Sequence, residues 1–300
     1  MVRSILADKS SIWIKYSVKV PAEFVEPVVR MFSKFLTQNV YVEQLGDPED
    51  GVEKLNTRVS GFSPKKNTTN KLESNLKSGL LLFSGVFDLS EIFIEEVNSD
   101  VWEKQKFEPI EINDIQILPS KDHSLKKGYI GIVIEPSMAF GTGHHPTTKM
   151  CISLIKKYIS NNFNVLDLGC GSGILGIASI KYGAKYCLSL DIEEESVKAA
   201  KQNSIDSKVK GIESKQLDLT QSIDINFVPE MIIGNLNSYL FKEGIKNIVN
   251  LMSKNTIMIA SGILIENYKE INKLFIDNGL LEIDKQENGD WTALVLQKNA

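Results

Sequence analysis

A glycine-rich turn preceded by an acidic residue is the stretch of this chain best suited to bind a nucleotide. Residues 164–176 read NVLDLGCGSGILG, so an apolar run leads into the turn and a helical pattern follows it at once. The turn holds three glycines at alternate positions, Gly169, Gly171 and Gly173. A strand that feeds such a turn brings backbone N–H groups close to a ligand. Asp167 precedes the turn, and Asp191 ends the next apolar run 22 residues after Gly169, about the spacing of a ribose-binding carboxylate.

The turn fits two classes of nucleotide cofactor. Gly171, Gly173 and Gly176 match the G-x-G-x-x-G fingerprint of NAD-binding enzymes. In the other register, Asp167 precedes the glycines and resembles the first motif of methyltransferases, in which the acid holds the ammonium group of S-adenosylmethionine. Asp191 would bind the ribose hydroxyls of either cofactor, so the turn alone does not decide between them.

A second motif, MAFGTGHHPTTK at residues 138–149, is expected to complete the site. Pro146 suits the start of the helix expected over residues 148–158. The hydroxyl of Thr148 would lie near the N-terminus of that helix, where the carboxylate of a methionyl group is stabilised. Phe140 could cover a sulfonium or its methyl group through a cation–π contact. Four residues of this motif are therefore expected to contact the cofactor: Phe140, Gly141, Thr142 and Thr148.

The paired histidines of the second motif do not predict a metal site. His144 and His145 are accompanied by a single third histidine, which is remote in the sequence, and no carboxylates complete a ligand set. The cysteines are widely spaced and form no C-x-x-C pair: Cys151, Cys170 and Cys187. They suit small buried residues in a reducing cytoplasm. We therefore expect neither a metal ion nor a disulfide.

A third motif, IIGNLNS at residues 232–238, places an amide at the end of a strand. Residues 231–233 read as a buried strand, so Asn235 falls at its carboxyl end, where open α/β sheets bind ligands. Asn235 could accept hydrogen bonds from an amine and point the lone pair of the amine at a methyl group. It is therefore the expected catalytic residue, with a helix-capping role as the alternative. Asn237 is expected to cap the helix that begins near Ser238.

The elements around these motifs alternate as in a doubly wound α/β domain. Helical patterns separate apolar runs that predict parallel strands over residues 165–168, 186–190, 212–217, 231–233 and 256–260. Near the end, two apolar runs flank Asn288 and Gly289, which predicts a hairpin whose last strand runs antiparallel to the others. Class I S-adenosylmethionine methyltransferases have a Rossmann-like parallel sheet closed by such a hairpin. This pattern favours S-adenosylmethionine over NAD.

The first hundred residues predict a smaller α+β domain. Strands are expected over residues 11–20, 40–45, 57–62 and 91–97, and helices over residues 21–38 and 72–87. The order β-α-β-β-α-β is that of a ferredoxin-like domain. Residues 1–98 are therefore assigned to this domain, residues 99–127 to a linker with some structure of its own, and residues 128–300 to the cofactor-binding domain.

Composition narrows the class of partner. The chain has 300 residues, of which 42% are hydrophobic and 24% charged, and a net charge of −4 argues against nucleic acid as the main partner. No apolar run approaches the ~20 residues that a membrane span needs. The N-terminal residues MVRSILADKSS lack the apolar core of a signal peptide. We therefore expect a cytoplasmic protein without a membrane partner.

The motifs taken in order resemble one methyltransferase family. MAFGTGHHPTT, VLDLGCGSGILGIAS, GNL, SGIL and a closing W-T-A-L strand are similar to the PrmA-type enzymes that act on large-subunit ribosomal protein eleven. The resemblance covers residues 128–298 and extends more loosely to the N-terminal domain; FGTGxHPTT is its most specific part. It implies methylation of lysine ε-amines and an N-terminal α-amine of that protein with S-adenosylmethionine. It also implies substrate binding by the small domain and cofactor contacts at Thr148, Gly169, Asp191 and Asn235.

The chain departs from the family pattern in its N-terminal third. The family linker has a second tryptophan shortly after the first, whereas Trp102 is followed here by Glu-Lys-Gln-Lys, and the polar loop at residues 63–70 has no family counterpart. A ribosomal protein is the expected partner of a monomeric enzyme. The alternatives are methylation of another protein or a small amine, an NAD-dependent oxidoreductase, and a cofactor-binding module without catalysis.

Overall fold

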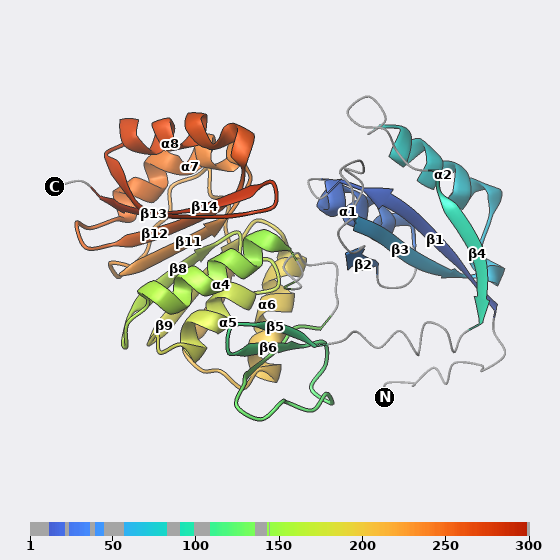
Figure 1. The fold of residues 1–300 in the computed structure, drawn as a ribbon, viewed down its shortest axis with the longest axis horizontal. Coiled ribbons are helices and arrows are strands. Elements are labelled where there is room, and N and C mark those ends of the chain that lie inside the picture. The colour runs from blue at the N-terminus through green and yellow to red at the C-terminus, as the bar shows by residue number, and fades with distance from the viewer. Residues whose placement is uncertain are drawn as a thin grey trace. The chain divides into compact units, whose positions relative to one another are not determined.

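The chain folds into two compact units, Met1–Phe107 and Glu108–Ala300 (Figure 1). The computed structural model describes residues 12–21, 24–36, 40–44, 57–82, 91–98, 109–135, 143 and 145–298. Within these ranges, no helix combines the length and the apolar character that a membrane crossing requires.

The first unit contains a four-stranded antiparallel sheet in the order β2-β3-β1-β4. Its elements are β1 (Ile12–Val20), α1 (Val25–Phe35), β2 (Tyr41–Gln44), β3 (Thr57–Pro64), the short 3₁₀ helix η2 (Lys65–Asn67), α2 (Asn70–Leu81) and β4 (Phe93–Asn98). The alternation in β1 buries Tyr16 and Val18 in a core with Val28 and Phe32 of α1. This arrangement confirms the predicted β-α-β-β-α-β order of a ferredoxin-like domain.

The ends of the helices in this unit follow from local signals. Helix α2 begins after Thr69, whose hydroxyl accepts a hydrogen bond from the backbone N–H of Leu72 at 3.1 Å. The helix ends at Leu81, so the helical spacing that continues to Phe87 does not extend it, and residues 83–90 lie outside the described ranges. Helix α1 begins at Val25, so Pro27 lies in its first turn, where a proline is tolerated.

The second unit is built on a seven-stranded sheet in the order β10-β9-β8-β11-β12-β14-β13. The strands are β8 (Asn164–Leu168), β9 (Tyr186–Asp191), β10 (Ile212–Gln216), β11 (Met231–Asn235), β12 (Ile257–Leu264), β13 (Leu280–Asn288) and β14 (Trp291–Lys298). Strands β8 to β12 pair in parallel, whereas β14 is antiparallel to both β12 and β13. The predicted parallel sheet with a closing antiparallel hairpin is therefore confirmed.

Helices cover both faces of this sheet (Figure 1). They are α4 (Pro146–Tyr158), α5 (Ile174–Lys181), α6 (Glu194–Asp206), α7 (Ser238–Leu251) and α8 (Tyr268–Asp277), with the 3₁₀ helix η3 (Ile265–Asn267) before α8. Residues of α4 and α5 share one core with Val165 and Ile233, and residues of α7 and α8 share the other with Leu166 and Ile232. Because parallel strands end at the same edge, the polar residues that follow β8, β9, β11 and β12 gather there.

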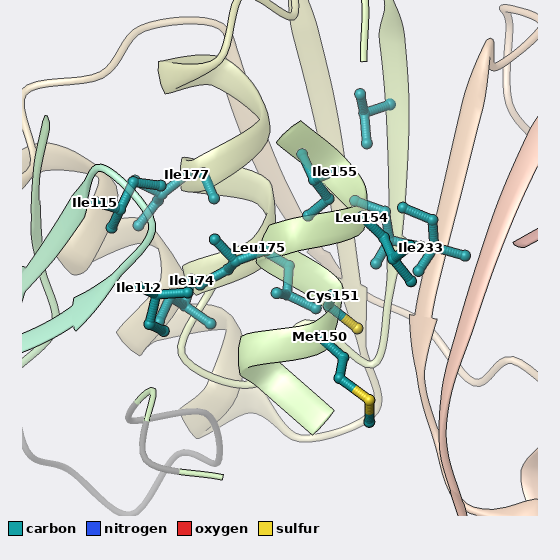
Figure 2. Packing of buried hydrophobic residues seen from close by; sticks show 14 of the residues in the cluster. Ile112, Ile115, Met150, Cys151, Leu154, Ile155, Ile174, Leu175, Ile177 and Ile233 are labelled. Carbon is teal, nitrogen blue, oxygen red and sulfur yellow. The ribbon is translucent and has the colours of Figure 1, made fainter. Parts of the chain in front are cut away.

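A small sheet precedes the first helix of this unit and belongs to its core. It consists of β5 (Ile110–Ile112), β6 (Ile115–Leu118) and β7 (Ile130–Val133), in that order. Figure 2 shows Ile112 and Ile115 beside Ile174 and Ile177 of α5, and all four are buried. The linker predicted over residues 99–127 therefore needs correction, because from Glu108 onward the chain is part of the second unit and its apolar side chains fill that core.

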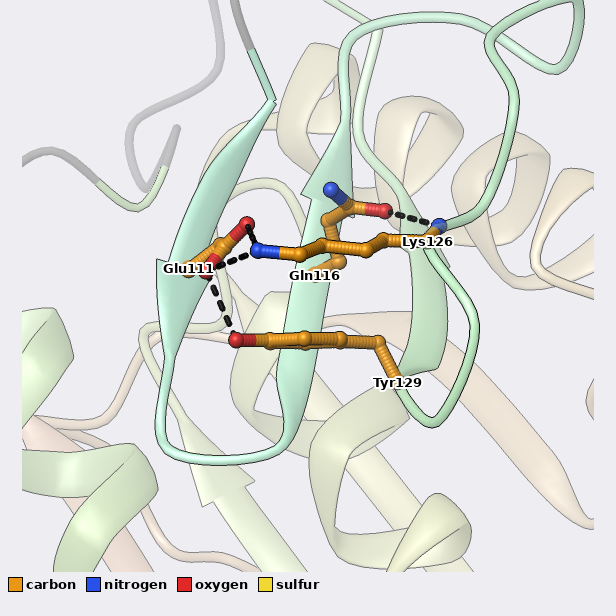
Figure 3. Close-up of polar contacts among 4 residues, drawn as sticks. All are labelled: Glu111, Gln116, Lys126 and Tyr129. Carbon is orange, nitrogen blue, oxygen red and sulfur yellow. Dashed lines mark hydrogen bonds and ion pairs between the residues drawn. The ribbon is translucent and has the colours of Figure 1, made fainter.

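Polar contacts hold the connection between β6 and β7 against the small sheet (Figure 3). The backbone N–H of Lys126 donates to the Gln116 side chain at 2.8 Å, and the Lys126 ammonium lies 3.0 Å from the Glu111 carboxylate. The Tyr129 hydroxyl donates to the same carboxylate at 2.7 Å. The hydrogen bond from Tyr129 and the charge of Lys126 hold the pKa of Glu111 below its ordinary value. This polar stretch is thus fixed on the sheet.

Candidate functional site

The glycine turn joins β8 to α5 at the carboxyl edge of the sheet. Gly169, Gly171 and Gly173 have φ angles of +68°, +52° and +79°. Other residues rarely adopt this left-handed region. Gly173 caps α5, and a Cβ built on it would lie 2.8 Å from the Cβ of Ala200 in α6. Backbone conformation and the close approach of α6 therefore both require glycine at position 173.

Asp167 lies in β8, two residues before the turn, and only one of its carboxylate oxygens has a hydrogen-bond partner among the described residues. The side chain is buried, and its Oδ2 accepts a hydrogen bond from the backbone N–H of Gly176 at 3.1 Å. Its Oδ1 has no hydrogen-bond partner among the residues that the structure describes. Burial raises the pKa of Asp167 to about 7. A buried carboxylate with a free oxygen suits a cationic ligand group, which would compensate for the lost hydration.

Gly176 has a packing role. A Cβ at this position would lie 2.8 Å from the Ser189 hydroxyl oxygen and 3.0 Å from the Cys187 sulfur, both in β9. The glycine thus lets α5 lie directly on the sheet. The third glycine of the dinucleotide fingerprint serves the same purpose, so this residue does not distinguish the two cofactors.

Asp191 ends β9 and is tied to the glycine turn. Its Oδ2 accepts a hydrogen bond from the N–H of Gly171 at 2.8 Å, and its Oδ1 accepts one from the N–H of Glu193 at 3.0 Å. An ionised carboxylate has about four acceptor sites, so both oxygens can still accept bonds from ribose hydroxyls. Asp191 can therefore support the turn and bind a ribose at the same time.

The N-terminus of α4 offers a second binding group. Thr148 lies in the first turn of this helix and is buried, and its hydroxyl has no hydrogen-bond partner within the described ranges. The dipole of a helix N-terminus favours an anion. In α4 the first N–H groups already have partners, because those of Thr147, Thr148 and Lys149 donate to His145. A free hydroxyl at this place suits the carboxylate of an amino acid.

His145 is explained by capping and packing. Its Nδ1 accepts a hydrogen bond from the N–H of Thr147 at 3.3 Å and so caps α4. Its ring meets Trp291 of β14 edge-on, with 4.8 Å between the ring centroids. His144 lies outside the described residues. Among those that are described, no three His, Cys, Asp or Glu side chains cluster closely enough to hold a metal ion.

Other residues of the second motif can be placed only in part. Phe140, Gly141 and Thr142 lie outside the described residues, so their expected cofactor contacts stay predictions. Gly143 is buried with a φ of +92°, and a Cβ there would overlap the side chain of Ile117 in β6. The small sheet thus supports this motif at Gly143.

Asn235 ends β11 beside β12, which continues past it to Leu264. It pairs with Ser261, which is fully buried, and the carbonyl of Ser261 accepts a hydrogen bond from the N–H of Leu236 at 2.9 Å. Asn237 caps α7, since its Oδ1 accepts a bond from the N–H of Leu240 at 2.9 Å, which confirms the expected cap. Asn235 is therefore not needed as the cap and is available to a ligand at this edge.

Two residues that support the site were not among the expected site residues, although Ser261 opens the SGIL motif. Ser261 follows a strand that was expected to end at Ala260, and β12 extends to Leu264. Asn203 of α6 is buried, and its side chain contacts the glycine turn through the carbonyl of Ser172. One signal in the sequence could have indicated Asn203: it is a polar residue three positions after Ala200, on the inner face of the expected helix.

The chain is similar to proteins of one family over almost its full length. A family model described as "Ribosomal protein L11 methyltransferase (PrmA)" matches residues 12–299. A ribosomal protein L11 methyltransferase of Caldicellulosiruptor bescii is 29% identical over 303 residues, which cover 95% of this chain and 99% of that protein. The protein of the same name from Caldicellulosiruptor saccharolyticus is 33% identical over 246 residues, or 80% of each chain.

A solved structure supports the same relationship. The ribosomal protein L11 methylase of Lactobacillus delbrueckii subsp. bulgaricus is 26% identical and superposes with a TM-score of 0.60. The match covers 65% of this chain and 100% of that chain. The family match, in contrast, extends over both compact units of the present chain.

Proposed function

Because the chain belongs to the ribosomal protein L11 methyltransferase (PrmA) family, we propose that it methylates lysine ε-amines and the N-terminal α-amine of ribosomal protein L11. Its cofactor is S-adenosylmethionine. The observation that carries the proposal is a pair of buried oxygens, Asp167 Oδ1 and Thr148 Oγ1, that have no hydrogen-bond partner among the described residues. They suit the ammonium and the carboxylate of an amino acid, which S-adenosylmethionine contains and NAD lacks.

The described residues fit this cofactor group by group. Asp167 would hold the ammonium, Thr148 and the N-terminus of α4 the carboxylate, and Asp191 the ribose. The glycine turn would face the cofactor with its backbone. S-adenosylmethionine supplies a methyl group bound to a positively charged sulfur. The contacts of Phe140, Gly141 and Thr142 are part of the same proposal.

Asn235 is the proposed catalytic residue on the acceptor side. A lysine amine has a pKa of about 10.4 in water and must be neutral to attack a methyl group. Removal from water and a nearby positive charge both lower the pKa of the amine. The side-chain oxygen of Asn235 would accept hydrogen bonds from the neutral amine and direct its lone pair. We therefore assign catalysis to the positioning of the amine, with proton loss to water.

The first unit is the proposed substrate-binding domain. It has a pocket of about 470 Å³, and its lining includes Lys15, Lys19, Arg58, Phe93 and Glu95. Charged groups of both signs around an exposed aromatic ring suit a protein surface better than an apolar small molecule. Since the proposed substrate is a ribosomal protein, the enzyme would act in the cytoplasm. The proposal also includes a monomeric enzyme and, given the net charge of −4, no direct contact with nucleic acid.

Two measurements test the proposed function. Calorimetric titration of the purified protein with S-adenosylmethionine and with NAD should give binding of the first alone, and binding of NAD would refute the cofactor site. Tritiated S-adenosylmethionine should label L11 among ribosomal proteins from cells that lack the enzyme, and mass spectrometry should place the methyl groups on lysines and the N-terminus. Labelling of a different protein, with L11 unlabelled, would refute the substrate.

A further inference from the structure

Helix α6 and its C-cap carry a row of small buried side chains on one face. They are Ala200, Asn203 and Ser207, which are spaced by three and four positions and so lie on one face, with Ser207 directly after the helix. All three are buried. Ala200 allows the close approach of Gly173 described above. The two polar members of the row form hydrogen bonds with different partners.

Asn203 uses both ends of its carboxamide. Its Nδ2 donates to the carbonyl oxygen of Ser172 at 2.9 Å, and its Oδ1 accepts from the backbone N–H of Glu135 at 3.2 Å. Because a carbonyl can only accept and an N–H can only donate, these two partners fix the orientation of the amide. An aspartate at this position would keep the acceptor and lose the donor.

The partners of Asn203 lie in two segments that are far apart in the sequence. Ser172 lies between Gly171 and Gly173, both of which have positive φ angles. Glu135 follows β7 and comes three residues before the MAFGTGHHPTT motif. A single buried amide therefore connects the glycine turn with the chain that leads to the second motif.

Ser207, on the same face as Asn203, serves as a comparison for its hydrogen bonds. Its hydroxyl accepts a hydrogen bond from the N–H of Val133 at 2.9 Å and donates to the carbonyl of Val133 at 3.2 Å. It thus attaches the end of α6 to the end of β7, as Asn203 attaches the helix to Glu135. The Ser207 hydroxyl thus bonds to two atoms of Val133, whereas Asn203 also holds the turn.

We propose that Asn203 is a positioning residue for cofactor binding. With Asp191 holding the N–H of Gly171 and Asn203 holding the carbonyl of Ser172, side chains fix the turn at two neighbouring peptide groups. The turn is then already in its binding conformation before the cofactor arrives, which lowers the cost of ordering it. This role rests on the proposed placement of S-adenosylmethionine at the turn.

The test compares Asn203→Asp with Ser207→Ala. The first variant keeps the size of the side chain and replaces its donor with an oxygen that repels the Ser172 carbonyl. Its Kd for S-adenosylmethionine, measured by calorimetry, should rise about tenfold or more, as expected for the loss of one buried hydrogen bond. Ser207→Ala should change the Kd by less than about twofold, since the loss of its bonds to Val133 leaves the turn anchored. In steady-state kinetics, Asn203→Asp should raise the KM for S-adenosylmethionine and leave kcat at saturation nearly unchanged.

The Kd values of the two variants separate a positioning role from a purely structural one, and urea unfolding shows whether each variant is folded. If the Kd of Asn203→Asp stays at the wild-type value, or if both variants raise it equally, the proposal is overturned. Should Asn203→Asp fail to fold, Asn203→Ser replaces it, because this smaller polar side chain cannot span the two partners and should give the same rise in Kd. A wild-type protein that does not bind S-adenosylmethionine would refute the proposed function itself, which distinguishes that failure from a failure of Asn203.

Discussion

The carboxylate of Asp191 accepts a hydrogen bond from the backbone N–H of Gly171, with 2.8 Å between Oδ2 and the nitrogen. The acid that the spacing predicts as a ribose ligand is therefore also a support of the glycine turn. Because its other oxygen accepts a bond from Glu193, the same side chain links the end of β9 to the start of α6. Loss of this carboxylate affects the shape of the turn as well as any direct contact with the cofactor.

Replacement of Asp191 by Ala should weaken S-adenosylmethionine binding by about 100-fold, since both a charged ligand contact and a turn support are lost. Asp277→Ala is a matched control. Asp277 accepts hydrogen bonds from the ammonium of Lys273 at the exposed end of α8, at 3.0 and 2.8 Å. The control should bind the cofactor as the wild type does in a calorimetric titration. Equal affinities of the two variants would contradict the role of Asp191.

Asp167 predicts opposite effects of pH on stability and on binding. Its pKa is raised to about 7 by burial, so between pH 4 and 7 the folded protein holds a proton that the unfolded chain has lost. Stability without cofactor should therefore fall as pH rises through this range, by up to about 1.4 kcal/mol per pH unit. Affinity for S-adenosylmethionine should rise between pH 6 and 7.5, because the ionised carboxylate binds the ammonium.

The variant Asp167→Asn tests this pair of effects. It removes the buried charge, so unfolding by urea at pH 7.5 should show a protein that is more stable than the wild type in the absence of cofactor. The same variant should bind S-adenosylmethionine more weakly, and its affinity should lose the rise between pH 6 and 7.5. A pH dependence that survives the substitution would assign the titration to another group.

Local signals in the sequence were sufficient for the parts of the site that lie on one stretch of chain. The glycine turn, the Asn237 cap and the Asn288–Gly289 hairpin each depend on neighbouring residues, and each was predicted. Two strands of the small sheet, β5 and β6, were assigned to a linker with some structure of its own, because they are short and their burial depends on α5, which is distant in the sequence. Asn203 was missed for the same reason: a helical pattern does not show that a polar residue faces a carbonyl of another segment.

Gly143 lies against Ile117 of the small sheet, so its replacement tests how closely that sheet packs on the second motif. An alanine there would be strained at a φ of +92° and would overlap Ile117, whereas Gly128 has a φ of +91° with no atom within 4 Å of a Cβ. Gly128→Ala should therefore lose about 1 kcal/mol of unfolding free energy through backbone strain alone. Gly143→Ala should lose about 2–4 kcal/mol, since overpacking adds to that strain. Urea unfolding of both variants measures the difference, and equal losses would show that the contact with the small sheet does not matter.

Asn235 and Asn237 lie two residues apart, and their replacement by alanine is expected to change different properties: kcat for Asn235 and the free energy of unfolding for Asn237. Asn237→Ala removes the cap of α7, so it should lower the free energy of unfolding by about 1 kcal/mol and leave kcat close to that of the wild type. Asn235→Ala should lower kcat by about 100-fold or more, because the amine loses the group that orients it, while the calorimetric Kd for S-adenosylmethionine changes much less. Measuring kcat, Kd and unfolding on both variants makes each the control of the other. Normal turnover of Asn235→Ala would show that this residue has no catalytic role and would remove it from the proposed mechanism.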